Sequence, residues 1–222
     1  MTSIFSFRTL IKNEQLPCFI VNDALDPEGC CNIIKQLKDQ VEPGTHMDSN
    51  TGELIKSDTR KSGVKFFKDD TLNARLRELV DIANHEAGWR YDIVDQEMAQ
   101  FTSYDGAEQQ TYDWHTDGQG CHLNARNSTL FHQKQDLKHI SQANLLGTVR
   151  KISVSALLND RYEGGELAFR YLNDQAELVE QRLACKQGDV IIFPSYLDHK
   201  VYPVTKGIRY SVVAWFGGPP FK

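Results

Sequence analysis

The sequence predicts an α+β fold in which helices come first and a β-sandwich or jelly roll follows. Two segments of the N-terminal half repeat apolar residues at helical spacing. From residue 94 onward, short runs rich in β-branched and aromatic residues alternate with glycine-containing turns. Helices grouped before strands are typical of α+β chains. At 222 residues the chain fits a single domain, with a helical flank over 1–93 and a jelly-roll core over 94–222.

Both expected helices have recognisable ends. Asp26 can cap the first helix, with Pro27 at its first position. Gly88 is expected just beyond the end of the second helix, where glycine is common. The apolar stripe of the first helix consists of Ile33, Ile34, Leu37 and Val41. That of the second consists of Leu72, Leu76, Leu79, Val80, Ala83 and Ala87. Both stripes are expected to face the core.

Composition argues against several classes of protein. The formal net charge of −5 at pH 7 gives no electrostatic case for nucleic-acid binding. No apolar run is long enough to cross a membrane, and the first ten residues lack the apolar core of a secretory signal. The five cysteines are odd in number and include no C-x-x-C pair. This favours reduced thiols in a cytoplasmic compartment over a disulfide framework.

One constellation of residues carries chemistry, in the order H-x-D…H…R. It consists of His115 and Asp117, then His199, then Arg209. Residues two apart on a strand point to the same face, so His115 and Asp117 are expected to lie together. Two histidines and one carboxylate leave coordination positions open, which suits a non-haem Fe(II) that activates oxygen. The arginine adds a planar fork suited to a carboxylic-acid cosubstrate.

The wider context decides between a metal site and a structural role. An isolated H-x-D pair, or a single histidine at the start of a strand, is more often structural than metal-binding. Here the run from Ile208 to Phe216 is strand-like and places Arg209, Ser211, Val213 and Trp215 on one face. The second histidine, the arginine and the strands together favour the metal site.

At these residues the chain resembles the 2-oxoglutarate- and Fe(II)-dependent oxygenases, and among them the prolyl 4-hydroxylase-like branch. The segments that carry the resemblance are residues 19–28, 104–106, 112–117, 163–167, 188–194 and 199–215. They extend over nearly the whole chain apart from 44–60 and 118–148. The fold that this resemblance implies is a double-stranded β-helix (jelly roll) flanked by N-terminal helices.

The resemblance implies roles for individual residues. His115, Asp117 and His199 would be the Fe(II) ligands, and Arg209 would pair with the distal carboxylate of 2-oxoglutarate. Ser211 completes an R-x-S pattern for the same carboxylate. The metal ligands and Arg209 are therefore also the expected catalytic residues. O₂ is the second substrate, and ascorbate is a further candidate cofactor.

Other pocket residues are also implied by the resemblance. Tyr104 matches a tyrosine that lines the cosubstrate or substrate pocket, and Tyr112 is a candidate for the substrate pocket. Trp215 matches a pocket tryptophan of oxygen-sensing relatives, but a core position is an equal alternative. Some prolyl hydroxylases have a cosubstrate-binding tyrosine on the strand matching 151–158, where this chain has none. The pocket is therefore expected to be completed differently.

The activity that the resemblance implies is hydroxylation of an unactivated C–H bond, with release of succinate and CO₂. A peptidyl proline is the first candidate substrate, and a free amino acid or another small metabolite is the alternative. A nucleic-acid demethylase would need R-x-x-x-x-x-R, but position 215 is tryptophan. Arg209 favours an oxygenase over a zinc hydrolase, and the intact ligand set argues against a non-catalytic metal-binding module.

The sequence leaves more than one role possible for two polar segments. Residues 118–148 carry His122, His132 and His139 and lack clear periodicity. Such a long connection predicts either a substrate-covering segment or a surface loop, and solvated histidines are favoured over a second metal site. Residues 44–60 are a candidate for a second flap over the same cavity.

Overall fold

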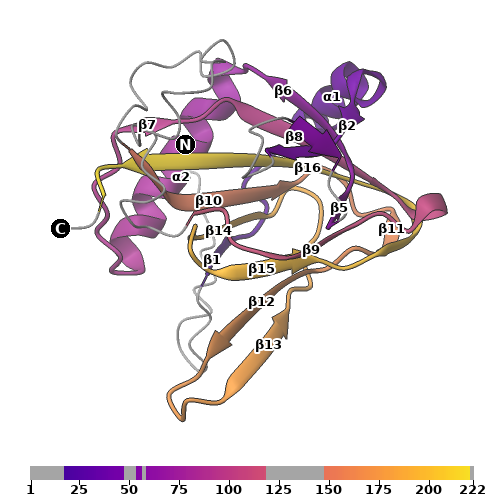
Figure 1. The fold of residues 1–222 in the computed structure, drawn as a ribbon. Coiled ribbons are helices and arrows are strands. Elements are labelled where there is room, and N and C mark those ends of the chain that lie inside the picture. The colour runs from indigo at the N-terminus through magenta and orange to yellow at the C-terminus, as the bar shows by residue number, and fades with distance from the viewer. Residues whose placement is uncertain (1–17, 48–53, 57–58, 119–147, 221–222) are drawn as a thin grey trace.

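The computed structural model describes residues 18–47, 54–56, 59–118 and 148–220. Two antiparallel β-sheets face each other, and the two long helices cover the outer side of the larger sheet (Figure 1). The predicted α+β jelly roll with flanking helices is therefore confirmed. Residues 119–147, which include the three loop histidines, lie outside the described residues.

The larger, major sheet follows the order β1-β14-β10-β16-β8-β6-β2, and β11 and β7 also pair with β16. Its strands are β1 (Phe19–Val21), β2 (Glu42–Pro43), β6 (Gly63–Phe67), β7 (Asp95–Gln96), β8 (Ala99–Asp105), β10 (Val149–Leu157), β11 (Tyr162–Gly164), β14 (Val190–Pro194) and β16 (Val204–Gly218). The long β16 lies at its centre, between β10 and β8.

The smaller, minor sheet follows the order β13-β12-β15-β9-β5. Its strands are β5 (Arg60–Lys61), β9 (Thr111–His115), β12 (Leu167–Leu172), β13 (Leu178–Arg182) and β15 (Asp198–Val201). The β12–β13 hairpin extends away from the body of the molecule (Figure 1). A separate hairpin joins β3 (Thr45–Met47) to β4 (Leu54–Lys56), within the segment expected to be a flap.

Both expected helices form where their caps predict. Helix α1 (Pro27–Leu37) begins after Asp26, whose side chain accepts a hydrogen bond from the Gly29 N–H. Helix α2 (Asp70–Glu86) is followed by Gly88 with a positive φ of 71°. Val41 lies beyond α1, after the short 3₁₀ turn η2 (Lys38–Gln40), yet it still packs against the core. A second 3₁₀ turn, η3 (Gly106–Glu108), follows β8.

The N-terminal part of the chain contributes strands as well as helices. Strands β1, β2 and β6 extend the major sheet, and β5 pairs with β9 in the minor sheet. The expected helical flank over 1–93 is therefore also part of both sheets. None of the helices in the described parts of the chain is long and apolar enough to cross a membrane.

The two faces of the major sheet differ in chemistry because side chains alternate along each strand. The face toward the helices is apolar and fully buried, as at Phe101 on β8, Val154 on β10 and Val212 on β16. The face toward the minor sheet carries buried polar side chains from the same three strands. They are Gln100, Thr102, Ser153, Ser155, Arg209 and Ser211. Buried polar groups need partners, so this face is suited to a polar ligand rather than to a core.

Candidate metal centre

His115, Asp117 and His199 lie together between the two sheets, and their ligand atoms are all within 4.8 Å of one another. His115 ends β9 and His199 lies near the start of β15, and the two residues are direct partners in the antiparallel ladder. The sheet pairing therefore joins two histidines that are far apart in sequence.

Asp117 is placed differently from the expectation that it shares a strand with His115. It lies two residues beyond the end of β9, outside the ladder. Its backbone N–H and that of Gly118 both donate to the carbonyl oxygen of Ser195, each at 2.9 Å. A turn held by Ser195, rather than strand alternation, directs the carboxylate toward the histidines.

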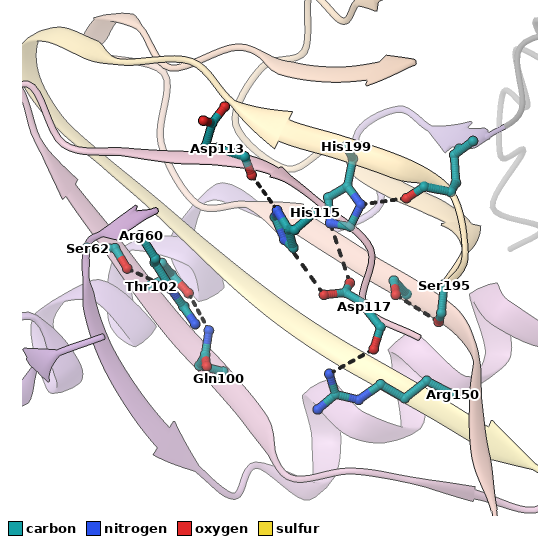
Figure 2. Close-up of polar contacts among 12 residues, drawn as sticks. Arg60, Ser62, Gln100, Thr102, Asp113, His115, Asp117, Arg150, Ser195 and His199 are labelled. Carbon is teal, nitrogen blue, oxygen red and sulfur yellow. Dashed lines mark hydrogen bonds and ion pairs between the residues drawn. The ribbon is translucent and has the colours of Figure 1, made fainter. Parts of the chain in front are cut away.

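Hydrogen bonds determine which nitrogen of each imidazole faces the site (Figure 2). Nδ1 of His115 lies 2.7 Å from the carbonyl oxygen of Asp113, and Nδ1 of His199 lies 2.8 Å from that of Leu197. A carbonyl only accepts, so both Nδ1 atoms donate and both Nε2 atoms keep a free lone pair. The Nε2 atoms lie 3.9 Å (His115) and 3.5 Å (His199) from the carboxylate oxygens of Asp117.

Electrostatics keep His115 and Asp117 in their metal-binding forms. Burial, followed by the nearby His199, lowers the pKa of His115 to about 4, so the imidazole is neutral at pH 7. Burial alone would raise the pKa of Asp117. His199, His115 and Arg150, together with a hydrogen bond from Ser153, instead lower it to about 2. A neutral imidazole and an ionised carboxylate are the forms that bind a divalent metal.

Aromatic rings surround the histidines. The ring of Tyr112 stacks on His115 with 3.5 Å between centroids, and Phe193 packs edge-on to His199 at 4.8 Å. The guanidinium carbon of Arg60 lies 4.9 Å from the ring centroid of Tyr112. The predicted pocket residue Tyr112 thus packs on a ligand, and this apolar surround limits the access of water to the site.

Arg209 and Ser211 lie on the same inter-sheet face of β16. Nη1 of Arg209 donates to Oγ of Ser211 at 2.9 Å, while the buried Nε–H has no hydrogen-bond partner among the residues that the structure describes. The residue is only 1% exposed, so an unpartnered N–H of a guanidinium is costly unless a ligand accepts from it. Arg209 borders a cavity of about 240 Å³ that also touches Leu157 and Ile191. Its donors fit a bound carboxylate.

Tyr104 lies beside Arg209 and close enough to Asp117 for their charges to interact. It is the direct partner of Arg209 in the β8–β16 ladder, and the guanidinium carbon lies 5.6 Å from its ring centroid. Burial raises the pKa of Tyr104, Arg60 and Arg209 oppose this, and Asp117 adds to it. The charges of both Arg209 and Asp117 therefore influence the pKa of the Tyr104 phenol.

Sequence reasoning missed the residues behind Asp117. Arg150 contacts the backbone of Asp117 and forms a bidentate pair with Glu97, and its guanidinium lies 4.1 Å from the ring centroid of Trp215. Trp215 thus lies beside the metal site on the inter-sheet face, not in the core against the helices. No sequence motif links Glu97 to Arg150, because the two residues are 53 positions apart and meet only in the folded chain.

A larger open depression of about 530 Å³ lies beside α2, next to Tyr91 and Pro219. It contains none of the residues of the metal centre or of the arginine pocket. Of these two cavities, the smaller one is the one that Arg209 lines, and the metal ligands are not among its lining residues.

Residues 99–217 match the family model described as the 2OG-Fe(II) oxygenase superfamily, which is more than half of the chain. The chain belongs to the 2OG-Fe(II) oxygenase superfamily. The resemblance seen in the sequence is thereby confirmed. The protein is a 2-oxoglutarate-dependent dioxygenase, with Fe(II), 2-oxoglutarate and O₂ as cofactor and cosubstrates.

Named relatives agree with this assignment. A PKHD-type hydroxylase of Shewanella sp. strain ANA-3 is 28% identical over 188 residues, or 82% of this chain and 71% of the relative. One from Alteromonas mediterranea is 26% identical over 152 residues, 66% of this chain and 57% of that protein's length.

The solved structures share the fold. A prolyl-4-hydroxylase of Pseudomonas putida superposes with a TM-score of 0.58 at 16% identity, covering 93% of this chain and 94% of that one. A Trichoplax adhaerens prolyl hydroxylase, in complex with a peptide fragment of the hypoxia inducible factor oxygen degradation domain, superposes with a TM-score of 0.62 at 16% identity. That match covers 90% of this chain and 83% of the other.

Proposed function

We propose that this dioxygenase hydroxylates a peptidyl proline at carbon 4, with release of succinate and CO₂. The observation that carries the cosubstrate half of the proposal is the buried, unpartnered Nε–H of Arg209 on the polar inter-sheet face. The substrate half is supported by fold likeness to prolyl hydroxylases, one of them bound to a peptide. We also infer that the chain forms one domain, because β1 and β16 belong to the same sheet.

In this proposal His115, Asp117 and His199 bind the iron through two Nε2 atoms and one carboxylate. Iron held by these three residues would supply the oxygen activation. The protein's own part is to orient the three ligand side chains. The carbonyls of Asp113 and Leu197 fix the two imidazoles, and the Ser195 carbonyl fixes the turn at Asp117.

Arg209 binds the distal carboxylate of 2-oxoglutarate, and Ser211 orients its guanidinium from one side. Leu157 borders the same cavity, and it lies on the strand on which some prolyl hydroxylases supply a tyrosine. In this proposal Arg209 contacts the cosubstrate, and Ser211 and Tyr104 are its neighbours on the same side of the site. Tyr112 and Trp215, on either side of the ligands, are the candidate contacts for substrate.

A neutral or basic peptide is the better substrate on electrostatic grounds, because the chain carries a formal net charge of −5. A free amino acid or other small metabolite remains the second candidate. The names of the curated relatives specify a hydroxylase without specifying proline, which keeps this candidate open.

The test is an anaerobic titration with Fe(II) and 2-oxoglutarate, followed by a succinate assay in air. Proline-containing peptides, the same peptides with alanine for proline, and free amino acids are supplied in parallel. The proposal expects succinate formation with the proline peptides only, and a mass gain of one oxygen on the proline. Coupled turnover with free amino acids, and none with any peptide, would establish the small-molecule alternative instead.

A further inference from the structure

Arg150, at the start of β10, makes three polar contacts with its guanidinium. Nε and Nη2 donate to the two carboxylate oxygens of Glu97 at 2.7 and 2.8 Å, and Nη1 donates to the carbonyl oxygen of Asp117 at 3.3 Å. Its flat face covers the indole of Trp215 at 4.1 Å. Figure 2 shows Arg150 below Asp117, on the side opposite the two histidines.

This contact matters because Asp117 is the one of the three ligands that lies outside a strand. Each histidine belongs to a strand, and its Nδ1 is tied to a carbonyl. Asp117 lies outside the ladder and is held by the turn at Ser195, by Ser153 at its carboxylate and by Arg150 at its carbonyl. Arg150 is therefore one of three contacts that determine where the carboxylate points.

Charge balance explains the part of Glu97. A lone guanidinium beside a cation site would repel the metal, whereas a bidentate pair with Glu97 carries no net charge. The side chain of Glu97 is 12% exposed and that of Arg150 is 28% exposed, so solvent screens the pair only in part. Arg150 can thus hold the Asp117 backbone without opposing the metal.

We propose that Arg150 is a positioning residue for the metal ligand Asp117, with Glu97 as the partner that orients and neutralises it. Arg150 acts through Asp117 and touches no reacting atom. The inference deepens the proposed function and rests on it for the identity of the resident metal. It concerns metal binding, so it can be measured without turnover.

The chain offers a matched control in Arg170, on β12 of the minor sheet. Its Nε donates to the Asp198 carboxylate at 2.9 Å, and its guanidinium carbon lies 4.5 Å from the ring centroid of Trp114. It therefore repeats the arginine, carboxylate and indole set of Arg150. Its partners precede His199 and His115 in sequence, but no contact joins Arg170 itself to a ligand among its described interactions.

The experiment measures Co(II) affinity and the visible Co(II) spectrum of the full chain for wild type, Arg150→Gln, Glu97→Gln, their double variant and Arg170→Gln. Supporting contacts behind a metal ligand typically change metal affinity by about 10–100-fold. We expect Arg150→Gln and Glu97→Gln to weaken Co(II) binding about tenfold or more and to alter the spectrum. The double variant should lose no more than Arg150→Gln, because the two residues act as a unit.

Arg170→Gln should bind Co(II) within about twofold of wild type with an unchanged spectrum. Circular dichroism shows whether each variant is folded, and Arg150→Lys, which keeps the charge but not the fork, replaces Arg150→Gln if the latter does not fold. Wild-type affinity and spectrum in the Arg150 variants, or an equal loss in Arg170→Gln, would overturn the inference. Failure of wild type to bind Co(II) would instead overturn the metal site in the proposed function.

Discussion

The two faces of the major sheet are built from the same strands, but one buries apolar side chains and the other buries polar ones. Toward the helices, Phe101, Val154 and Val212 are fully buried among apolar neighbours. Toward the minor sheet, Thr102, Ser211 and Arg209 are equally buried but polar. Adjacent positions on one strand therefore differ in what they do, because alternation sends one side chain to each face.

This difference shows that the helix-facing side stabilises the fold, whereas the inter-sheet side contains groups whose burial destabilises it. Apolar burial against α1 and α2 favours folding at roughly 25 cal/mol per Å². A buried guanidinium whose Nε–H lacks a partner disfavours it, as at Arg209. The inter-sheet face is thus held in place by the helix-facing side and kept polar for ligands.

The largest expected effect is on the inter-sheet side of the comparison. Asp117→Ala removes the only carboxylate of the ligand set and should abolish 2-oxoglutarate turnover. Because Asp117 lies outside the strands, the thermal unfolding midpoint should change little. Succinate assay and calorimetry check both. Retained iron-dependent turnover in Asp117→Ala would mean that the ligands are assigned wrongly.

The opposite result is expected on the helix-facing side. Phe101→Ala should lower the free energy of unfolding by about 3–5 kcal/mol, since it leaves a cavity in the core. Under conditions in which Phe101→Ala is folded, its metal affinity should equal that of wild type. Urea denaturation measures the loss. Leu172→Ala, at a side chain 65% exposed, is the control and should stay within about 0.5 kcal/mol of wild type.

Arg209→Met sharpens the comparison because it separates binding from stability. Losing a charge-assisted pair to a buried carboxylate costs about 2–5 kcal/mol, which is at least a roughly thirtyfold weaker affinity for 2-oxoglutarate. Stability should be unchanged or higher, since an apolar side chain of similar length replaces a buried charge. Arg209→Lys should restore only part of the affinity. Equal 2-oxoglutarate affinity in wild type and Arg209→Met would disprove the carboxylate site.

The smallest effect is expected at Ser211. Ser211→Ala removes one hydrogen bond to the guanidinium of Arg209, worth about 0.5–1.5 kcal/mol. The apparent KM for 2-oxoglutarate should rise accordingly, by less than in Arg209→Met, while metal affinity stays the same. A larger loss than in Arg209→Met would show that the hydroxyl, not the arginine, is the main contact of the cosubstrate.

Local patterns made much of this molecule predictable. Helix α2 follows from its apolar spacing and the glycine after it, and the inter-sheet face of β16 follows from alternation at Arg209 and Ser211. His115 and His199 were predictable because each stands in a strand-like run with matching neighbours. These features depend on residues close in sequence, where propensity and periodicity act.

The features that escaped prediction depend on register between distant segments. Strands β2, β5 and β7 have two residues each and exist only because a partner strand pairs with them. Asp117 was expected on a strand, but the carbonyl of Ser195 holds it in a turn instead. The pairing of Arg150 with Glu97 spans 53 residues and has no local signature. Tertiary contacts decide all three.

Calorimetric titration with Mn(II) and then 2-oxoglutarate, in wild type, Asp117→Ala and Arg209→Met, tests most directly whether the polar inter-sheet face is the ligand site. Wild type should bind one Mn(II), and 2-oxoglutarate only afterwards. Arg209→Met should bind Mn(II) with wild-type affinity but 2-oxoglutarate at least about thirtyfold more weakly. Asp117→Ala should bind neither. Wild-type Mn(II) affinity in Asp117→Ala, together with unchanged 2-oxoglutarate affinity in Arg209→Met, would contradict the account.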